Sequence, residues 1–152
     1  MTTETSIIST AEDMEKLGER IGQRLKGGEV IELVSDLGGG KTTLVRGLAR
    51  GVGSSDVVGS PTFTLSKVYR APVFEVFHFD FYRLHEAGLM AHELQDLLGE
   101  PHSVVVVEWG DVVQHVLPEK RLTLRIDKTP EGARKVAIIC PDELAYLTEG
   151  LG

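Results

Sequence analysis

The segment SDLGGGKT, residues 35–42, constrains the fold of this chain more than any other part of the sequence. It ends in Gly-Lys-Thr, as does the phosphate-binding pattern G-x-x-x-x-G-K-[ST], but Ser35 stands where the pattern has its first glycine. Residues 30–34 before it form a short apolar run typical of a buried strand, and apolar residues recur at helical spacing after Lys41. A strand, a glycine turn and a helix in this order favour a phosphate-binding loop over an ordinary glycine-rich turn.

The residues of this loop suit an anionic ligand. Gly38, Gly39 and Gly40 let backbone N–H groups turn inward without a Cβ in the way, and the positive end of the following helix dipole adds to the attraction. We expect Lys41 to reach the β- and γ-phosphates of a nucleotide and Thr42 to offer its hydroxyl to Mg²⁺.

Composition narrows the class of protein. A chain of 152 residues suffices for one compact core, so we expect residues 1–152 to form a single domain. Cys140 is the only cysteine, which excludes an intrachain disulfide and a multi-cysteine zinc site. No apolar run approaches the roughly 20 residues that cross a bilayer, and residues 1–10 lack signal-peptide features, so we expect a cytoplasmic protein.

The charge of the chain bears on nucleic-acid binding. The net charge is −7 at pH 7, and the only Lys/Arg groupings that stand out are the pairs Lys120–Arg121 and Arg134–Lys135. Proteins that bind nucleic acids directly usually present a basic face. Any role in nucleic-acid metabolism is therefore expected to run through a protein partner.

Periodicity and turn residues predict the order of elements. A helix is expected over residues 12–25, with Thr10 as its N-cap and Asp13 in its first turn. Further expected elements are strands 62–71 and 73–84 joined as a hairpin through Ala71–Pro72, a helix over 91–98, a buried strand over 103–110, strands 121–127 and 134–140, and a final helix over 143–147 capped by Asp142. This mixture of βα units and hairpins predicts a three-layer α/β domain with a mixed sheet.

Three hydroxyl side chains lie in the sequence after the glycine-rich loop, far enough along for the chain to return to it. Ser60, Thr62 and Thr64 flank Pro61, about 20 residues after Lys41, where a returning loop could contact the γ-phosphate as switch loops do. A plain turn before the next strand explains the same residues equally well.

The segment HFDFYR, residues 78–83, places an acid at the end of an apolar strand. The alternating phenylalanines share one face and are most simply core, whereas His78, Asp80 and Tyr82 share the other. Burying an unpaired carboxylate is costly. We therefore expect Asp80 either to have a functional partner or to form an ion pair with Arg83.

A second acid ends the strand predicted over residues 103–110. Glu108 follows four consecutive valines, at the strand end where ligands bind in open α/β sheets, and its carboxylate suits a Walker-B role of holding Mg²⁺ directly or through water. Trp109 beside it is compatible with a place in the core or over the nucleotide.

Together, SDLGGGKTTLVRGL, SPTFTL, HFDFYRL and VEWG resemble the successive motifs of the TsaE (YjeE) family, bacterial ATPases of tRNA threonylcarbamoyladenosine biosynthesis. The resemblance covers nearly the whole chain, from about Leu17 to the C-terminal strands, and the ordered combination is highly specific. Ser35 departs from the family's first glycine. Some members carry a basic residue that contacts the nucleotide near position 133, where this chain has Ala133 followed by Arg134.

The resemblance implies a P-loop NTPase-like α/β fold that binds ATP and Mg²⁺. It implies that Lys41 and the backbone of residues 37–41 hold phosphates, that Thr42 and Glu108 ligate Mg²⁺, and that Asp80 is needed for hydrolysis. It places Ser60 and Thr62 in a switch-like loop and Trp109 near the nucleotide. With these, the full set of ATP-binding candidates is Leu37, Gly38, Gly39, Gly40, Lys41, Thr42, Thr43, Ser60, Thr62, Trp109 and Arg134, and the catalytic candidates are Lys41, Asp80 and Glu108.

The resemblance also implies partners. Family members have a weak intrinsic ATPase and act with the TsaD–TsaB pair, which transfers a threonylcarbamoyl group to the adenosine beside the anticodon of ANN-decoding tRNAs. The ATPase supports turnover of that complex and meets tRNA only through it. Two other functions fit the loop: a small-molecule kinase, which would need an acceptor pocket and usually an arginine-bearing lid, and a nucleotide-gated adaptor in which Asp80 and Glu108 are structural.

Overall fold

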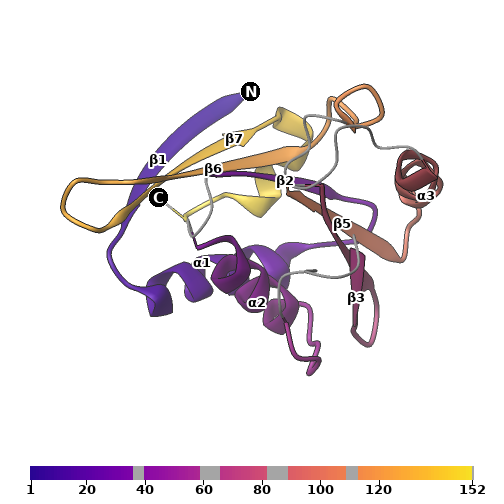
Figure 1. The fold of residues 1–152 in the computed structure, drawn as a ribbon, viewed down its shortest axis with the longest axis horizontal. Helices are drawn as coiled ribbons and strands as arrows, with labels where there is room; N and C mark the ends of the chain where they lie inside the picture. Colours follow the sequence, from indigo (N-terminus) through magenta and orange to yellow (C-terminus); the bar gives the residue numbers. More distant parts are fainter. Residues whose placement is uncertain (36–39, 59–65, 82–88, 109–112, 152) are drawn as a thin grey trace.

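The strands of this protein form one seven-stranded sheet in the order β1-β7-β6-β2-β5-β4-β3 (Figure 1). The structure is a computed structural model and describes residues 1–35, 40–58, 66–81, 89–108 and 113–151. The strands are β1 (Thr2–Ile8), β2 (Val30–Ser35), β3 (Ser66–Arg70), β4 (Glu75–Asp80), β5 (Ser103–Glu108), β6 (Leu122–Lys128) and β7 (Arg134–Cys140). The helices are α1 (Ala11–Arg24), α2 (Lys41–Gly51), α3 (Leu89–Leu97) and the 3₁₀ helix η2 (Asp142–Leu147).

Parallel and antiparallel pairs are combined in this sheet. Strand β2 lies parallel to both β5 and β6, and β4 lies parallel to β5. Strands β3, β7 and β1 add antiparallel pairs toward the two edges. The mixed sheet predicted from the sequence is confirmed, including the hairpin of β3 and β4.

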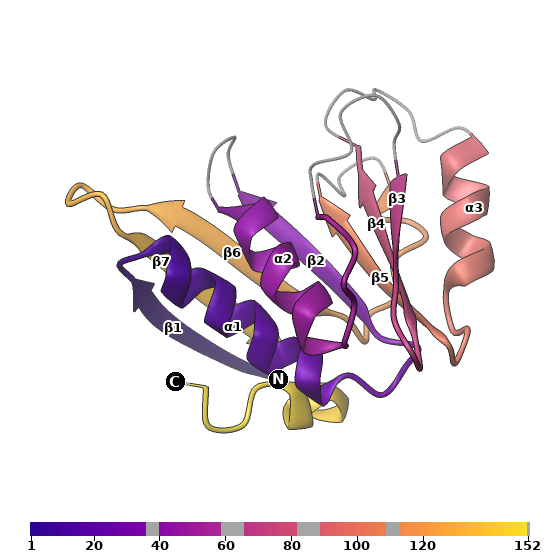
Figure 2. The ribbon, with the colours of Figure 1, turned by 90° about the horizontal axis from the view of Figure 1, so that it is seen from below.

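Helices cover the two faces of the sheet unequally. In Figure 2, α1 and α2 lie side by side on one face, and their apolar residues join a large hydrophobic core with residues of β2, β5, β6 and β7. On the opposite face, Leu94 of α3 joins Phe79, Phe81 and alternate residues of β5 in a second, smaller core. The α/β layering expected from the sequence follows from this alternation of side chains along buried strands.

Strand β5 is the most completely buried strand of the sheet. All six of its residues are buried, and it lies between β2 and β4 with parallel partners on both sides. A β-branched apolar run is typical of such a strand. Because β2, β4 and β5 run in the same direction, their carboxyl ends meet at one edge of the sheet, where β2 leads into the glycine-rich segment.

Two features at the chain's ends differ from the sequence-based predictions. Strand β1 was not predicted, because its Thr-rich sequence lacks an apolar alternation. Asp142 was predicted to cap a helix, but the residue at the N-cap of η2 is Pro141, and no side-chain hydrogen bond caps that helix. Asp142 instead accepts a hydrogen bond from the Met1 amine at 2.7 Å, and this bond raises the pKa of the amine.

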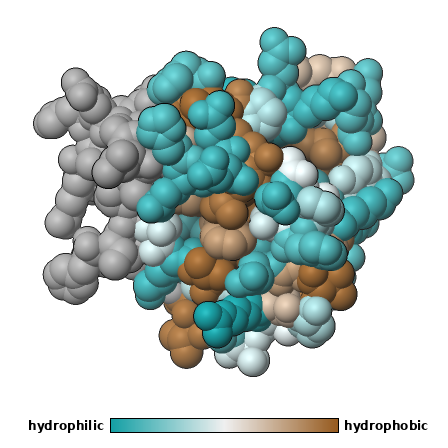
Figure 3. Space-filling view, turned by 90° about the vertical axis from the view of Figure 1, so that its right-hand side faces the viewer, coloured by the Kyte–Doolittle hydropathy of each residue, from teal (hydrophilic) through white to brown (hydrophobic). Residues whose placement is uncertain are grey.

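The surface of the described residues offers few extended apolar areas. No helix among them is long and apolar enough to span a bilayer. On the side where α3 lies in Figure 1, hydrophobic residues form several small areas separated by hydrophilic ones (Figure 3). Val57 and Val73 are among the exposed apolar residues, and single exposed apolar residues are ordinary on protein surfaces.

Helices α1 and α2 pack so closely that their backbones touch. Glycines stand at the contact on both helices: Gly18 and Gly22 on α1, and Gly47 and Gly51 on α2. A Cβ at Gly47 would lie 1.9 Å from the carbonyl oxygen of Glu15. Because this oxygen belongs to the backbone of α1, it cannot move aside as a flexible side chain could. Only glycine therefore allows this approach, which holds the first turn of α1 beside the first turn of α2.

We predict that Gly47→Ala destabilises the protein. In a helix interior, alanine is normally more stable than glycine by about 0.5–1 kcal/mol. A loss of stability in this variant would therefore come from the clash. We expect the free energy of unfolding, measured by urea denaturation, to fall by about 2–3 kcal/mol. Arg46→Ala, on the neighbouring exposed position, serves as the control and should change it by less than about 0.5 kcal/mol. A Gly47→Ala protein as stable as the wild type would contradict the backbone contact.

Candidate functional site

The glycine-rich segment lies between the end of β2 and the start of α2, as predicted. Ser35 ends β2, and Gly40 occupies the N-cap of α2 with φ 99°, in the left-handed region that favours glycine. The first intrahelical bond runs from the Leu44 N–H to the Gly40 carbonyl at 3.0 Å. The N–H groups of the first turn precede this bond and have no acceptor within a helix, so they suit an anion.

Lys41 is a buried cation at this helix start, with only 7% of its surface exposed. Its Nζ donates to the Ser35 carbonyl at 3.3 Å and lies 3.7 Å from Glu108 Oε1. The side chain therefore points toward the carboxyl ends of β2 and β5. Ser35, the residue that departs from the loop pattern, contributes its backbone oxygen to this arrangement.

Two carboxylates meet at the edge of the sheet. Glu108 ends β5 and is 2% exposed, and Asp80 ends β4 and is its register partner. Neighbouring strands lie about 4.8 Å apart, and partners in register point to the same face. That face is the one covered by α1 and α2, since Val106 and Val76 on it belong to their core. Both acids predicted from the sequence are thus brought together beside the start of α2.

His78 is part of this site, although the sequence did not assign it a function. Its Nε2 lies 2.5 Å from Glu108 Oε2, and its Nδ1 lies 3.2 Å from the hydroxyl of Tyr69. His78 and Tyr69 are almost completely buried, and each comes from a different strand. The sequence signal was the shared strand face of His78 and Asp80, but the contact with Glu108 depends on strand order.

The residues beside Glu108 fit a Mg²⁺ ion held together with phosphates. Mg²⁺ usually takes one or two protein oxygens and completes its shell with phosphate oxygens and water. Thr42 lies in the first turn of α2, next to Lys41 in sequence, and is only partly buried. Among the described residues, no group of three or more His, Cys, Asp or Glu could hold a metal ion alone. These donors would suit a cation that takes its remaining ligands from phosphate and water.

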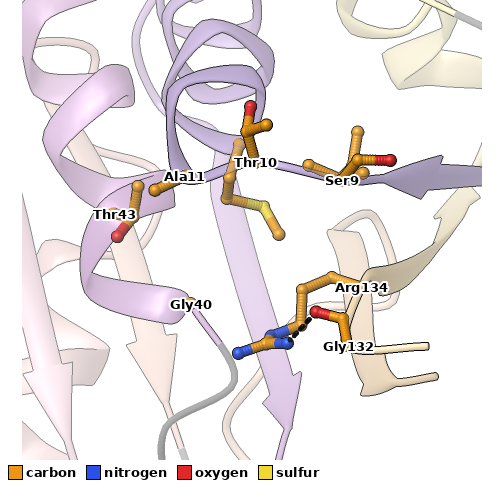
Figure 4. Close-up of a pocket in the computed structure, with 9 residues that line it drawn as sticks. Ser9, Thr10, Ala11, Gly40, Thr43, Gly132 and Arg134 are labelled. Carbon is orange, nitrogen blue, oxygen red and sulfur yellow. Dashed lines mark hydrogen bonds between the residues drawn. The ribbon is translucent and has the colours of Figure 1, made fainter. Parts of the chain in front are cut away.

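A cavity of about 270 Å³ opens beside the N-terminus of α2 (Figure 4). Its walls come from the β1–α1 junction, the start of α2 and the β6–β7 turn. The lining residues are Ile8, Ser9, Thr10, Ala11, Met14, Gly40, Thr43, Gly132 and Arg134. The sequence named Gly40, Thr43 and Arg134 as candidates, but it gave Thr10 only the role of helix cap.

Arg134 and Thr10 have defined local partners in this cavity. The Arg134 guanidinium extends toward the Gly40 side of the cavity and donates to the Gly132 carbonyl at 3.1 Å (Figure 4). Thr10 Oγ1 accepts the Asp13 N–H at 3.0 Å, so the predicted N-cap of α1 is confirmed. The start of α1 and the start of α2 thus both line this cavity.

Several predicted site residues lie outside the described residues. They are Leu37, Gly38 and Gly39 of the loop, Ser60 and Thr62 of the expected switch segment, and Trp109. Arg83, the alternative partner of Asp80, also lies outside them. The predictions made for these positions therefore stay predictions.

Comparison with known proteins gives consistent matches. The family model described as "Threonylcarbamoyl adenosine biosynthesis protein TsaE" matches residues 8–136. A protein from Streptomyces coelicolor named "tRNA threonylcarbamoyladenosine biosynthesis protein TsaE" is 42% identical over 120 residues, which cover 76% of this chain and 79% of the relative. A protein of the same name from Bacillus subtilis is 36% identical over 115 residues, covering 73% of this chain and 69% of the relative.

A solved structure supports the same grouping. The crystal structure of Bacillus subtilis YdiB superposes with a TM-score of 0.80 at 28% sequence identity. The match covers 99% of this chain and 94% of that chain. The similarity therefore extends over the sheet, the helices and the described part of the site.

We predict that Lys41 and Glu108 are energetically coupled in the protein without nucleotide. Removing one member of a buried pair leaves the other charge uncompensated, which costs about 3 kcal/mol or more. In a double-mutant cycle of Lys41→Met and Glu108→Gln, measured by urea denaturation, we expect a coupling energy of about 2 kcal/mol.

The exposed pair Lys16–Glu12 is the matched control for that cycle. Its atoms approach to 3.4 Å, which is closer than the buried pair, but both side chains are mostly exposed. Exposed helix pairs contribute about 0.3–0.5 kcal/mol. Equal coupling energies in the two cycles would show that burial adds nothing to the Lys41–Glu108 interaction.

Proposed function

This chain belongs to the TsaE family, and we propose that it is a Mg²⁺-dependent P-loop ATPase required for threonylcarbamoyladenosine formation in tRNA. One observation carries the proposal: Lys41, Asp80 and Glu108 come from three separate elements and meet at one sheet edge beside the start of α2. Ligands bind at such edges in open α/β sheets. The names of the relatives supply the pathway, since they describe proteins of tRNA threonylcarbamoyladenosine biosynthesis.

The first step is phosphate binding at the loop. The N-terminus of α2 offers backbone N–H groups and the positive end of its dipole, and Lys41 adds a mobile charge. Charge-assisted hydrogen bonds are roughly twice as strong as neutral ones, so the lysine should dominate the contact with the terminal phosphates. The backbone of residues 37–41 completes the binding in this proposal.

The second step is placement of the cation. We assign Thr42 and Glu108 to Mg²⁺, which supplies charge neutralisation to the transferring phosphoryl group when bound. Lys41 and Glu108 neutralise each other across 3.7 Å in the structure. ATP and Mg²⁺ together offer each of them a new partner of opposite charge, so neither buried charge is left alone.

The cavity beside Gly40 is assigned to the nucleoside part of ATP. Its volume of about 270 Å³ is close to the lower end of small-molecule pockets, which begin at about 300 Å³. Gly40 and Thr43 in its wall connect it directly to the phosphate loop. Arg134, at the start of β7, directs its guanidinium toward Gly40, which would place a cation near the phosphates.

Asp80 is assigned to hydrolysis itself. As the register partner of Glu108 it lies one strand away from the proposed cation ligand. In this position its carboxylate can orient the water that attacks the γ-phosphorus and releases ADP. Ser60, Thr62 and Trp109 complete the proposed nucleotide site, with the first two in a segment that senses the γ-phosphate.

The physiological role proposed is support of the TsaD–TsaB pair, with tRNA met only through that complex. The test is ATP turnover by the protein alone and then with TsaD, TsaB and tRNA. We expect slow release of phosphate alone and a clear increase with the partners. Phosphate transfer to a member of a metabolite panel would instead identify a kinase, and turnover unchanged by the partners would contradict the role.

We predict distinct defects for the three site residues. Lys41→Ala should abolish ATP binding, because the loop loses its only buried cation among the described residues. Asp80→Asn and Glu108→Gln should keep binding but cut turnover about 100-fold or more, as expected when a general base or a cation ligand is lost. Only Glu108→Gln should also raise the Mg²⁺ requirement. Arg46→Ala, an exposed residue on α2, is the control for the lysine variant. Normal turnover in both acid variants would make these acids structural.

We also predict that the nucleotide state controls the partner affinity. Only a difference in affinity between two states of the protein can drive a binding cycle. We expect ATP to order residues 59–64 for docking and hydrolysis to release the complex. The measurement is titration of TsaD–TsaB with the protein loaded with ADP or with a non-hydrolysable ATP analogue. Equal affinities, or tight binding to free tRNA without the partners, would contradict the cycle.

A further inference from the structure

Three buried polar side chains form a diagonal chain across neighbouring strands of the sheet. Tyr69 of β3 contacts His78 of β4, and His78 contacts Glu108 of β5. In the strand register, Tyr69 is opposite Val76 and His78 is opposite Val106, so each contact steps two residues toward the carboxyl edge. This series of side-chain contacts ends at Glu108, whose carboxylate faces Lys41.

The chemistry of these contacts fixes the direction of the hydrogen bonds. An ionised carboxylate only accepts hydrogen bonds, so Nε2 of His78 donates to Glu108. In a neutral imidazole Nδ1 is then the acceptor, and the hydroxyl of Tyr69 donates to it. The carboxylate of Glu108 therefore determines which histidine nitrogen carries the hydrogen, and the hydroxyl of Tyr69 satisfies the other nitrogen.

The hydrogen-bonded side chains of Tyr69 and His78 hold Glu108 through one of its two carboxylate oxygens. Its Oε2 is bonded to His78, while its Oε1 is directed to Lys41 Nζ at 3.7 Å. The two oxygens thus have different roles, one fixed by a rigid aromatic partner and one facing a flexible cation. A carboxylate clamped in this way presents one oxygen in a defined direction.

We propose that His78 is a positioning residue that, with Tyr69, orients Glu108 for the cation of the bound nucleotide. The inference rests on the proposed function and adds to it the residues that hold the cation ligand in place. Partners behind a metal ligand typically change metal affinity by about 10- to 100-fold when mutated. The side-chain contacts are not needed to join β3, β4 and β5, because continuous backbone ladders already connect these strands. A purely structural role therefore explains the contacts less well.

The test separates cation binding from nucleotide binding. ATP affinity is measured by calorimetry in EDTA and across a Mg²⁺ series, and Mn²⁺ binding to the ATP complex is followed by electron paramagnetic resonance. For His78→Leu we expect the Mg²⁺ concentration at half-maximal effect to rise about tenfold. The ATP affinity in EDTA should stay within about twofold of the wild type, because His78 makes no contact with the phosphate loop in the proposal.

Conservative variants keep the inference testable if His78→Leu folds poorly. His78→Gln retains a donor near the Nε2 position and should recover most of the cation affinity. Tyr69→Phe removes only the hydroxyl and should raise the Mg²⁺ requirement in the same direction by a smaller factor. Tyr146→Phe is the matched control, because its hydroxyl also contacts a buried glutamate, Glu29, at 2.7 Å but outside the site.

The outcomes distinguish this inference from the proposed function. A wild type without Mg²⁺-dependent ATP binding would overturn the proposed function and the inference together. A wild type with such binding, and His78 and Tyr69 variants with an unchanged Mg²⁺ requirement, would overturn the positioning role alone. Loss of ATP affinity in EDTA in the folded variants would also overturn it, because the residues would then be supporting the loop.

Discussion

The close contact of α1 and α2 determines how the first turns of the two helices are placed against the sheet. Glycines on both helices let the backbones meet, and a Cβ at Gly18 would lie only 2.1 Å from the Leu44 carbonyl oxygen. The contact holds the first turns of the two helices side by side, one carrying Thr10 and the other Thr43. Both turns line the cavity, and separating the helices would cost them their shared core.

Local patterns made the centre of the fold and much of the site predictable. The valine run of β5 indicated a buried parallel strand, which the structure confirms, and the acid after these valines was predicted to face a ligand at the strand end. Lys41 was recognisable because the loop pattern needs only a strand before it and a helix after it. Each of these signals lies within one stretch of sequence, so no knowledge of strand order was required.

Features that depend on strand order or on weak patterns could not be predicted. The contact of His78 with Glu108 joins residues 30 positions apart and follows from the pairing of β4 with β5. Strand β1 has too few apolar residues to show a period, and it is held mainly by backbone pairing with β7. Asp142 was predicted to cap a helix, but its carboxylate accepts a hydrogen bond from the amine of Met1, which is distant in sequence.

The buried pair of Lys41 and Glu108 explains why the proposed ligands belong together. Phosphate alone would draw Lys41 away and leave Glu108 as an uncompensated buried anion, while Mg²⁺ alone would leave the lysine without its partner. ATP and Mg²⁺ arriving together compensate both charges, so each should raise the affinity of the other, as linkage requires. The two side chains are not equivalent in this exchange. Glu108 is held by His78 and keeps its place, whereas the long side chain of Lys41 is the member that would exchange its present contacts for a phosphate.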